Sequence, residues 1–188
     1  DIDGEEIPIC DGSASAFVRC LLEAGIRVLP GKRRSVQILR PFVVEEKEAF
    51  VSIMPDEAFR ITYSIEYDHP VIGKQEKSFL VHKESFVKEI APARTFGFLK
   101  DVPALRERGL ALGGSLENAL VLDEKGVING PLHFPDEFVR HKILDFIGDL
   151  SLIGHSLIGH FKARKAGHDL HQKAVRFLLE NPKCWSFI

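Results

Sequence analysis

The fold is decided by a stretch in the second half of the chain. Residues 135–151 read Pro135-Asp136-Glu137-Phe138-Val139-Arg140-His141-Lys142-Ile143-Leu144-Asp145-Phe146-Ile147-Gly148-Asp149-Leu150-Ser151. Proline and acidic residues stand at its start, where helices favour them. Apolar residues recur at helical spacing, namely Phe138, Ile143, Leu144, Ile147 and Leu150. This pattern predicts an amphipathic helix whose apolar face packs on the rest of the molecule.

Three polar residues of this helix stand four residues apart: His141, Asp145 and Asp149. They form one stripe beside the apolar face, so we expect them to be partly buried. Burying them is costly unless they are paired, and a divalent metal could pair them. His141 and Asp145, one turn apart, can both reach one zinc ion. A structural ion pair explains the spacing equally well, and the spacing alone leaves both interpretations open.

Strands are predicted upstream of this helix, because β-branched and aromatic residues run or alternate there. The predicted strands are 36–39, 42–44, 50–53, 59–67 and the return strand 75–82. Shorter helices are predicted over 14–25, 84–91 and 102–108, with residues 94–99 irregular or extended and a strand at 118–123 that pairs back with 127–129. Downstream, residues 159–166 are predicted to be extended and residues 168–180 helical, with Ala174, Val175, Leu178 and Leu179 inward.

Composition is that of an ordinary globular protein. The 188 residues are 45% hydrophobic and 28% charged, with a net charge of −2, which gives no reason to expect a nucleic-acid partner. No apolar run approaches a membrane span, and no signal peptide is visible, although the chain does not begin with Met. Three cysteines without CxxC spacing do not indicate a disulfide framework.

The first 30 residues are expected to be the end of another domain. They contain one predicted strand and one predicted helix, which cannot bury a core alone. A basic linker, residues 29–34, follows them and marks the boundary. The predicted division is therefore 1–30 and 35–188.

The sequence of residues 136–150 is typical of one protein family. Residues 136–145, followed by Ile147-Gly148-Asp149-Leu150, resemble the bacterial UDP-3-O-acyl-N-acetylglucosamine deacetylases, zinc enzymes of the committed step in lipid A synthesis. Four further runs resemble the same family: Glu6-Ile7-Pro8-Ile9-Cys10-Asp11-Gly12-Ser13-Ala14, Arg94-Thr95-Phe96-Gly97-Phe98, Leu112-Gly113-Gly114-Ser115 and Lys165-Ala166-Gly167-His168. The resemblance covers nearly the whole chain.

The resemblance implies an α+β fold. Residues 35–188 would be the C-terminal deacetylase domain, a two-layer sheet-and-helix unit of β-α-α-β type with an inserted strand pair. Residues 1–30 would be the C-terminal tail of a similar N-terminal deacetylase domain. The implied reaction is zinc-dependent hydrolysis of the N-acetyl group of UDP-3-O-(3-hydroxyacyl)-N-acetylglucosamine by a cytoplasmic, monomeric protein. The implied partner is this UDP-linked substrate, with no integral membrane segment.

The resemblance also assigns a metal site. It makes His141 and Asp145 two zinc ligands. The family's third ligand and its general base belong to an N-terminal Glu-His motif, and no Glu-His pair occurs in these 188 residues. The chain is therefore expected to carry only part of the active site.

Catalytic roles are likewise implied. His168 would donate a proton to the leaving amine, Asp149 would orient and charge His168, and Thr95 and Lys142 would stabilise the oxyanion, Lys142 alternatively contacting a substrate phosphate. Phe96 would stack on or shape the sugar site. Taken alone, His168 could be a helix-cap residue, Asp149 a surface acid and Lys142 a solvated side chain.

An apolar channel for the acyl chain is also implied. It would be built by the strand pair around residues 68–72 and, on the opposite wall, by Val102, Leu112 and Gly114, where core packing is the alternative role. The sequence around His168 departs from the family pattern, which puts contacts of its neighbours in doubt. One of these neighbours, His171, is expected at the surface, with an adventitious metal site as the alternative.

Two other functions stay open. The protein could be a catalytically inactive relative that binds a sugar nucleotide or acyl carrier. It could also be an unrelated α+β binding module whose acidic residues form a structural ion network.

Overall fold

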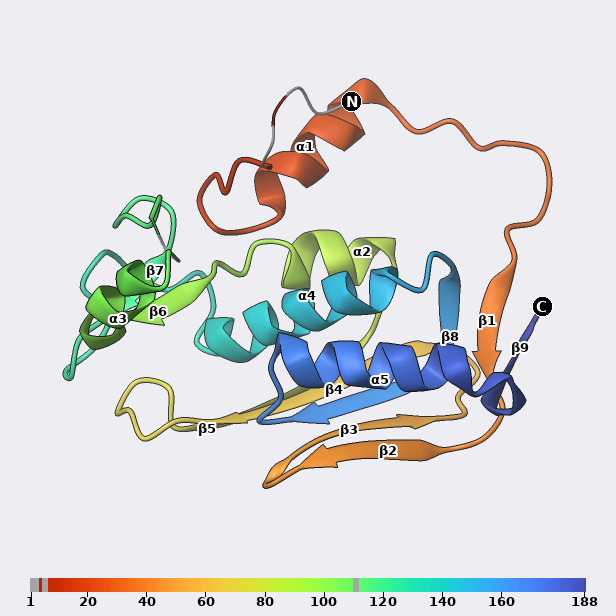
Figure 1. Ribbon diagram of the computed structural model, residues 1–188. Coiled ribbons are helices and arrows are strands. Elements are labelled where there is room, and N and C mark those ends of the chain that lie inside the picture. The colour runs from red at the N-terminus through yellow and green to blue at the C-terminus, as the bar shows by residue number, and fades with distance from the viewer. Residues whose placement is uncertain (1–3, 5–6, 110–111) are drawn as a thin grey trace.

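The structure is a computed structural model that describes residue 4, residues 7–109 and residues 112–188. Residues 1–3 and 5–6 of the predicted segment 1–30 lie outside the described residues. Glu6, the first residue of one of the runs that resemble the family, is among them. A mixed β-sheet is covered on one face by two long helices (Figure 1). This arrangement confirms the predicted two-layer α+β fold.

A helix comes first, five strands follow it, and helices and strands then alternate to the last strand. The strands are β1 (Ser35–Ile38), β2 (Phe42–Glu46), β3 (Ala49–Met54), β4 (Phe59–Glu66), β5 (Lys74–Leu80), β6 (Phe96–Phe98), β7 (Leu120–Leu122), β8 (Ser156–Arg164) and β9 (Trp185–Phe187). The helices are α1 (Ser15–Ala24), α2 (Lys83–Ser85), the π-helical η1 (Phe86–Ile90), the 3-10 turn η2 (Leu99–Asp101), α3 (Val102–Glu107), α4 (Glu137–Ser151), α5 (His168–Glu180) and the 3-10 turn η3 (Pro182–Cys184).

Strand β8 organises the sheet. Its first residues, 156–158, pair parallel with β1, and residues 159–164 pair with β3 on one edge and β4 on the other. β2 and β5 extend the sheet outward, and β9 pairs with β1. The two parts of β8 run in different directions in Figure 1, and the change of partners falls at Gly159.

The core lies between the sheet and the helix pair. α4 packs against β4 and β5, α5 packs against β2 and β3, and the two helices contact each other. Fully buried aromatic residues meet in this layer, from the sheet Tyr63 and Phe161 and from α4 Phe138 and Phe146. Burying apolar area of this kind is the main favourable contribution to folding. The helix pair is therefore held rigidly, and its exposed edges can carry a site.

A smaller lobe adjoins the start of α4. β6 and β7 pair in parallel and lie with α3 at the left of Figure 1. Leu122 and Val127 form an isolated antiparallel β-bridge. The predicted pairing of residues 118–123 with 127–129 is therefore confirmed as a single bridge. β4 and β5, the predicted strand pair, belong to the main sheet.

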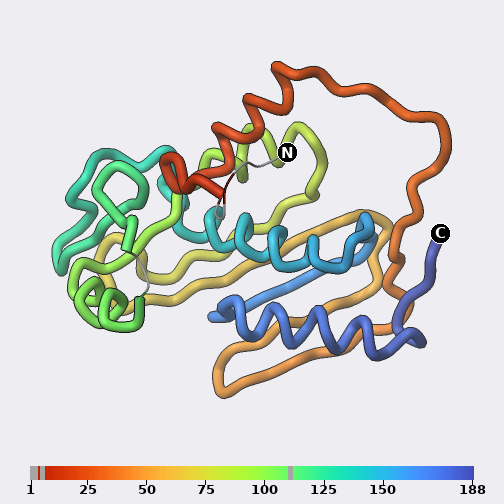
Figure 2. The backbone as a smooth tube through the Cα atoms, turned by 45° about the horizontal axis from the view of Figure 1, so that its top comes forward, coloured from red at the N-terminus to blue at the C-terminus, as the bar shows by residue number. Residues whose placement is uncertain are grey.

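The N-terminal segment lies apart from the main core. α1 has no buried residue, and a long connection leads from it to β1 (Figure 2). The segment is attached through backbone hydrogen bonds, from Ala14 N to Ala91 O at 2.9 Å and from Thr95 N to Gly12 O at 2.7 Å. The division at residues 29–34 stays a prediction.

Some local predictions were wrong. β8 begins at Ser156 rather than at 159, and β9 was not predicted, because strand pairing with β1 depends on contacts distant in the sequence. Leu179 is half exposed rather than inward. Residues 84–91 form a short α-turn that widens into a π-helical turn.

Candidate active site

α4 brings the two predicted metal ligands together. His141 is buried, and its Nδ1 donates to the Ala93 carbonyl at 3.0 Å. That hydrogen bond fixes the orientation of the ring, and Nε2 faces Asp145 Oδ1 at 3.3 Å. A metal-binding histidine needs a free imidazole nitrogen oriented in this way.

Asp145 is held as a carboxylate. Burial alone would raise its pKa, but the hydrogen bonds and charges of His141 and Lys142 outweigh burial and hold the pKa far below its usual range. Lys142 Nζ lies 3.0 Å from Asp145 Oδ2. His141 Nε2 must lose its proton before it can bind a metal, and the imidazole and the carboxylate can then supply two ligands of a divalent metal.

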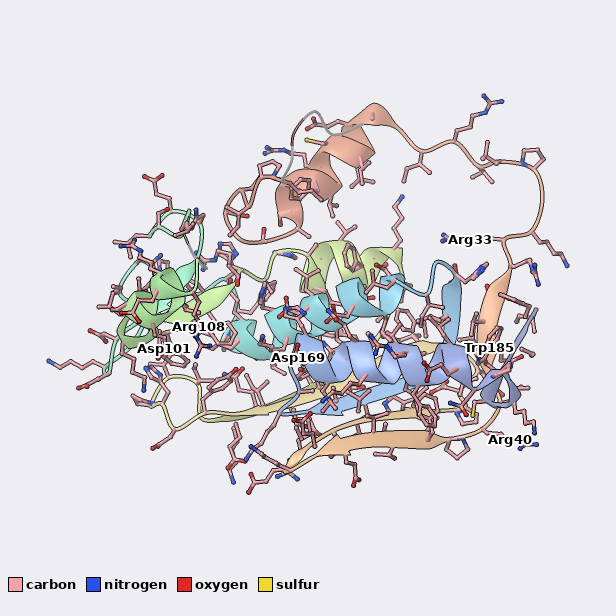
Figure 3. The ribbon with its side chains drawn as sticks, in the orientation of Figure 1. Arg33, Arg40, Asp101, Arg108, Asp169 and Trp185 are labelled. Carbon is pink, nitrogen blue, oxygen red and sulfur yellow. The ribbon has the colours of Figure 1, made fainter. Side chains whose placement is uncertain are left out.

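α5 contributes the predicted proton donor. Its N-cap, Gly167, has an extended backbone, and His168 is the first helical residue. In Figure 3 the labelled Asp169 marks the first turn of α5, which lies alongside α4. His168 Nδ1 lies 2.7 Å from Asp149 Oδ2, and its Nε2 lies 4.0 Å from Asp145 Oδ2. The exposed imidazole of His168 thus stands between the buried Asp149 and the predicted metal ligands.

The expectation that His171 lies at the surface was wrong. It has no exposed surface, because α5 turns this side chain inward onto Phe146 of α4. Its Nδ1 lies 2.7 Å from Asp149 Oδ2, and its Nε2 lies 3.0 Å from the Tyr63 hydroxyl. Burial lowers the pKa of His171, while the hydrogen bond to Asp149 acts in the opposite direction. The sequence held one signal: His168 and His171 are three residues apart, so both can face α4.

Phe96 and Thr95 follow one another beside the site. The Phe96 ring packs edge-on against Phe138, with centroids 5.0 Å apart, and against His141 at 6.3 Å. Lys142 Nζ lies 5.7 Å from the same ring centroid. The backbone of Thr95 is hydrogen-bonded to Gly12 and Leu120. Within the described part of the chain, no hydrogen bond joins its hydroxyl to His141, Asp145 or His168.

A buried ion pair fixes this segment on α4. Glu137 is fully buried and accepts from Arg94 Nε at 2.9 Å and from the Arg94 backbone N at 3.0 Å. Burial would raise the pKa of Glu137, but these hydrogen bonds and the Arg94 charge lower it below its usual value. Sequence analysis did not identify this pair, although Arg94 opens one of the resembling runs.

The predicted acyl channel is only partly matched by a cavity. A cavity of about 350 Å³ lies between the β4–β5 turn and the small lobe, lined by Asp68, His69, Pro70, Phe98, Leu99, Lys100, Leu122, Asp123 and Glu124. Val102 begins α3 nearby, but neither it nor the exposed Gly114 and Leu112 is among the lining residues. The structure therefore groups His141, Lys142, Asp145, Asp149 and His168 together and leaves Val102 and Gly114 in the lobe.

The residues present fit a metal. His141 and Asp145 offer one nitrogen and one oxygen donor from one helix face. Asp149, His168 and His171 also place possible ligand atoms within 4.8 Å of one another. In that second group both Nδ1 atoms are already hydrogen-bonded to one Asp149 oxygen, so a hydrogen-bonded network accounts for it. The first group is the better metal site.

Comparison with known proteins agrees with the resemblance. A family model described as UDP-3-O-acyl N-acetylglycosamine deacetylase matches residues 1–180. The chain belongs to this family. Members of the UDP-3-O-acyl N-acetylglycosamine deacetylase family from Syntrophotalea carbinolica and Citrifermentans bemidjiense are 52% and 48% identical over the whole chain. One from Thermodesulfovibrio yellowstonii is 52% identical over 96% of it. All three are named UDP-3-O-acyl-N-acetylglucosamine deacetylase.

The match to the UDP-3-O-acyl N-acetylglycosamine deacetylase family is partial in length. The chain spans 61% of the Syntrophotalea relative and 62% of the other two. No helix within residues 4, 7–109 and 112–188 is both long and apolar enough to cross a membrane.

Proposed function

We propose that these residues belong to a zinc-dependent enzyme that hydrolyses the N-acetyl group of UDP-3-O-acyl-N-acetylglucosamine for lipid A synthesis. The relatives' names support this substrate. The observation that carries the proposal is the 4.0 Å approach of His168 Nε2 to Asp145 Oδ2, which supports the assignment of His168 as a proton donor next to a metal ligand. The third ligand and the general base would come from the family's Glu-His motif, which these residues lack.

A bound zinc ion would supply Lewis-acid activation of the carbonyl and of water. The chain's own residues would complete the reaction. Hydrolysis adds a hydroxyl to the acyl carbon and breaks the carbon–nitrogen bond, and the departing amine needs a proton. His168 can give that proton from its exposed Nε2, while Asp149 stabilises the charged imidazole through Nδ1. Lys142 carries a positive charge next to Asp145 and can stabilise negative charge that develops on the substrate.

Contacts to the reacting group, the sugar and the acyl chain of the substrate complete the proposal. Thr95 and Phe96 would contact the reacting group and the sugar from the segment fixed by the Arg94–Glu137 pair. Val102 and Gly114 would contact the acyl chain in the small lobe, next to the 350 Å³ cavity. The cytoplasmic location and the monomeric state stay predictions.

The test is replacement of the proton donor. In the full-length protein, His168→Ala should lower turnover by a factor of about 10²–10⁴, the usual contribution of a general acid, and leave the zinc content unchanged. Near-normal turnover would exclude His168 as the proton donor. His155→Ala is the control, since His155 packs on Phe187, which belongs to β9 rather than to α4 or α5. Binding of the UDP-linked substrate without hydrolysis by the unmodified protein would instead support the inactive-relative alternative.

A further inference from the structure

A hydrogen-bonded chain runs from the interior to the exposed His168. The Tyr63 hydroxyl lies 2.6 Å from the Ala166 carbonyl and 3.0 Å from His171 Nε2. His171 Nδ1 and His168 Nδ1 each lie 2.7 Å from the same oxygen of Asp149, Oδ2. His171 is therefore a second imidazole on Asp149, approaching from the buried side.

Counting protons shows which His171 nitrogen donates to Tyr63. The Ala166 carbonyl can only accept, so the Tyr63 hydroxyl must donate to it. Burial raises the pKa of Tyr63 well above its usual range, so the hydroxyl keeps that proton. The contact between Tyr63 and His171 then requires a proton on His171 Nε2. One further proton must lie between His171 Nδ1 and Asp149.

The surroundings of His171 hold the ring in this orientation. The Phe146 ring stacks on it with centroids 4.5 Å apart, and the Tyr63 ring meets it edge-on at 5.8 Å. His171 has no exposed surface. A buried polar side chain whose two nitrogens both have partners is costly to displace, so Asp149 is held from within.

We propose that His171 is a positioning residue for the Asp149–His168 pair. Its Nδ1 donates to the Asp149 carboxylate from the buried side, and Tyr63 fixes the orientation of His171 by accepting from Nε2. This inference rests on the proposed function, because it acts through the proposed proton donor. A residue that only filled space would need a side chain of the right volume, whereas a positioning residue needs a donor at the Nδ1 position.

Two amide substitutions separate these roles. The Asn amide nitrogen can occupy the place of histidine Nδ1, and the Gln amide nitrogen can occupy the place of Nε2. His171→Asn therefore keeps a donor to Asp149, and His171→Gln keeps only the donor to Tyr63. In the full-length zinc enzyme we expect His171→Gln to lower kcat by a factor of at least about 10, with KM little changed, because loss of a supporting partner typically costs 10–100-fold. His171→Asn should retain most of kcat.

The outcomes decide the role. Equal kcat values for the Asn and Gln variants, or a Gln variant as active as the unmodified protein, would overturn the proposal. His160→Gln is the matched control, because His160 bonds Thr62 outside the Tyr63–His168 chain and should not affect kcat.

A spectroscopic measurement tests the network independently of activity. In the ¹⁵N NMR spectrum of the unmodified full-length protein, both ring nitrogens of His171 should carry a proton, and Tyr63→Phe should change the Nε2 shift. A His171 that lacks a proton on either ring nitrogen would overturn the proposal. An unmodified protein that shows this network but hydrolyses no UDP-3-O-acyl-N-acetylglucosamine would contradict the proposed function and leave the hydrogen-bonded chain intact.

Discussion

At the scale of single residues, the buried Arg94–Glu137 pair connects the segment of Thr95 and Phe96 to α4. Glu137 has no exposed side-chain surface and Arg94 has 15%. Arg94→Met should destabilise the protein by about 3–5 kcal/mol, because it leaves a buried carboxylate without its partner. Urea unfolding at pH 7 measures this change. Glu137→Gln added to the Arg94→Met variant should recover part of the loss, and a loss under about 1 kcal/mol would mean that the pair behaves as an exposed one.

The same carboxylate predicts a dependence on pH. Burial raises the pKa of Glu137, but Arg94 and two backbone donors lower it below the ordinary value of 4.5. A carboxyl whose folded pKa is depressed stabilises the fold above its unfolded pKa and loses that contribution as pH falls through the folded value. The thermal midpoint should therefore fall below pH 4.5, and it should fall less steeply in Glu137→Gln. Parallel curves for the two proteins would contradict this linkage.

Asp145 gives a prediction about metal. Burial would raise the pKa of Asp145, but His141 and Lys142 lower it far below its usual range, so a carboxylate oxygen is available as a donor. Asp145→Ala should reduce the zinc retained by the full-length protein after dialysis. His168→Ala is the comparison and should retain zinc fully. Equal zinc content in the two variants would remove Asp145 from the ligand set.

At the scale of elements, strand β8 depends on a glycine where it changes partners. A Cβ at Gly159 would lie 2.6 Å from Ile38 Cγ1 and 3.1 Å from Met54 O. Gly159→Ala should destabilise the protein by about 1–3 kcal/mol, since the core must shift to accept the methyl group. Ile38→Ala removes the nearest atom, so Gly159→Ala should cost less in that background, as a urea double-mutant cycle measures. Additive losses would show that Ile38 does not limit the space.

The elements also show which features the sequence could predict. α4 was predicted as 135–151 and found as Glu137–Ser151, because its caps and apolar period are local. β9 and the start of β8 were missed, because each is defined by pairing with the distant β1. The spacing of His141 and Asp145 can be recognised from the sequence, because both residues lie on one helix. The burial of His171 cannot, because it depends on how α5 packs on α4. Local periodicity therefore predicted elements, and tertiary packing decided the network around Asp149.

At the scale of the whole molecule, α1 lies apart from the main core and has no buried residue (Figure 1). Leu21 is 67% exposed and Val28, in the connection to β1, is 90% exposed. Ile26 and Leu29 of the same segment are likewise mostly exposed. The expected division at residues 29–34 gives the segment to a different domain from the one that carries α4 and α5.

The division of the site leads to a prediction for the whole protein. In the proposed site His141 and Asp145 would supply two ligands, whereas a catalytic zinc takes three from the protein. The 188-residue chain alone should therefore retain less zinc than the full-length protein, and only the full-length protein should hydrolyse UDP-3-O-acyl-N-acetylglucosamine. Zinc stoichiometry and deacetylation measured on the same preparations test both statements. Stoichiometric zinc in the 188-residue chain would mean that these residues hold a complete ligand set, and then the group of Asp149, His168 and His171 would be its source of further ligands.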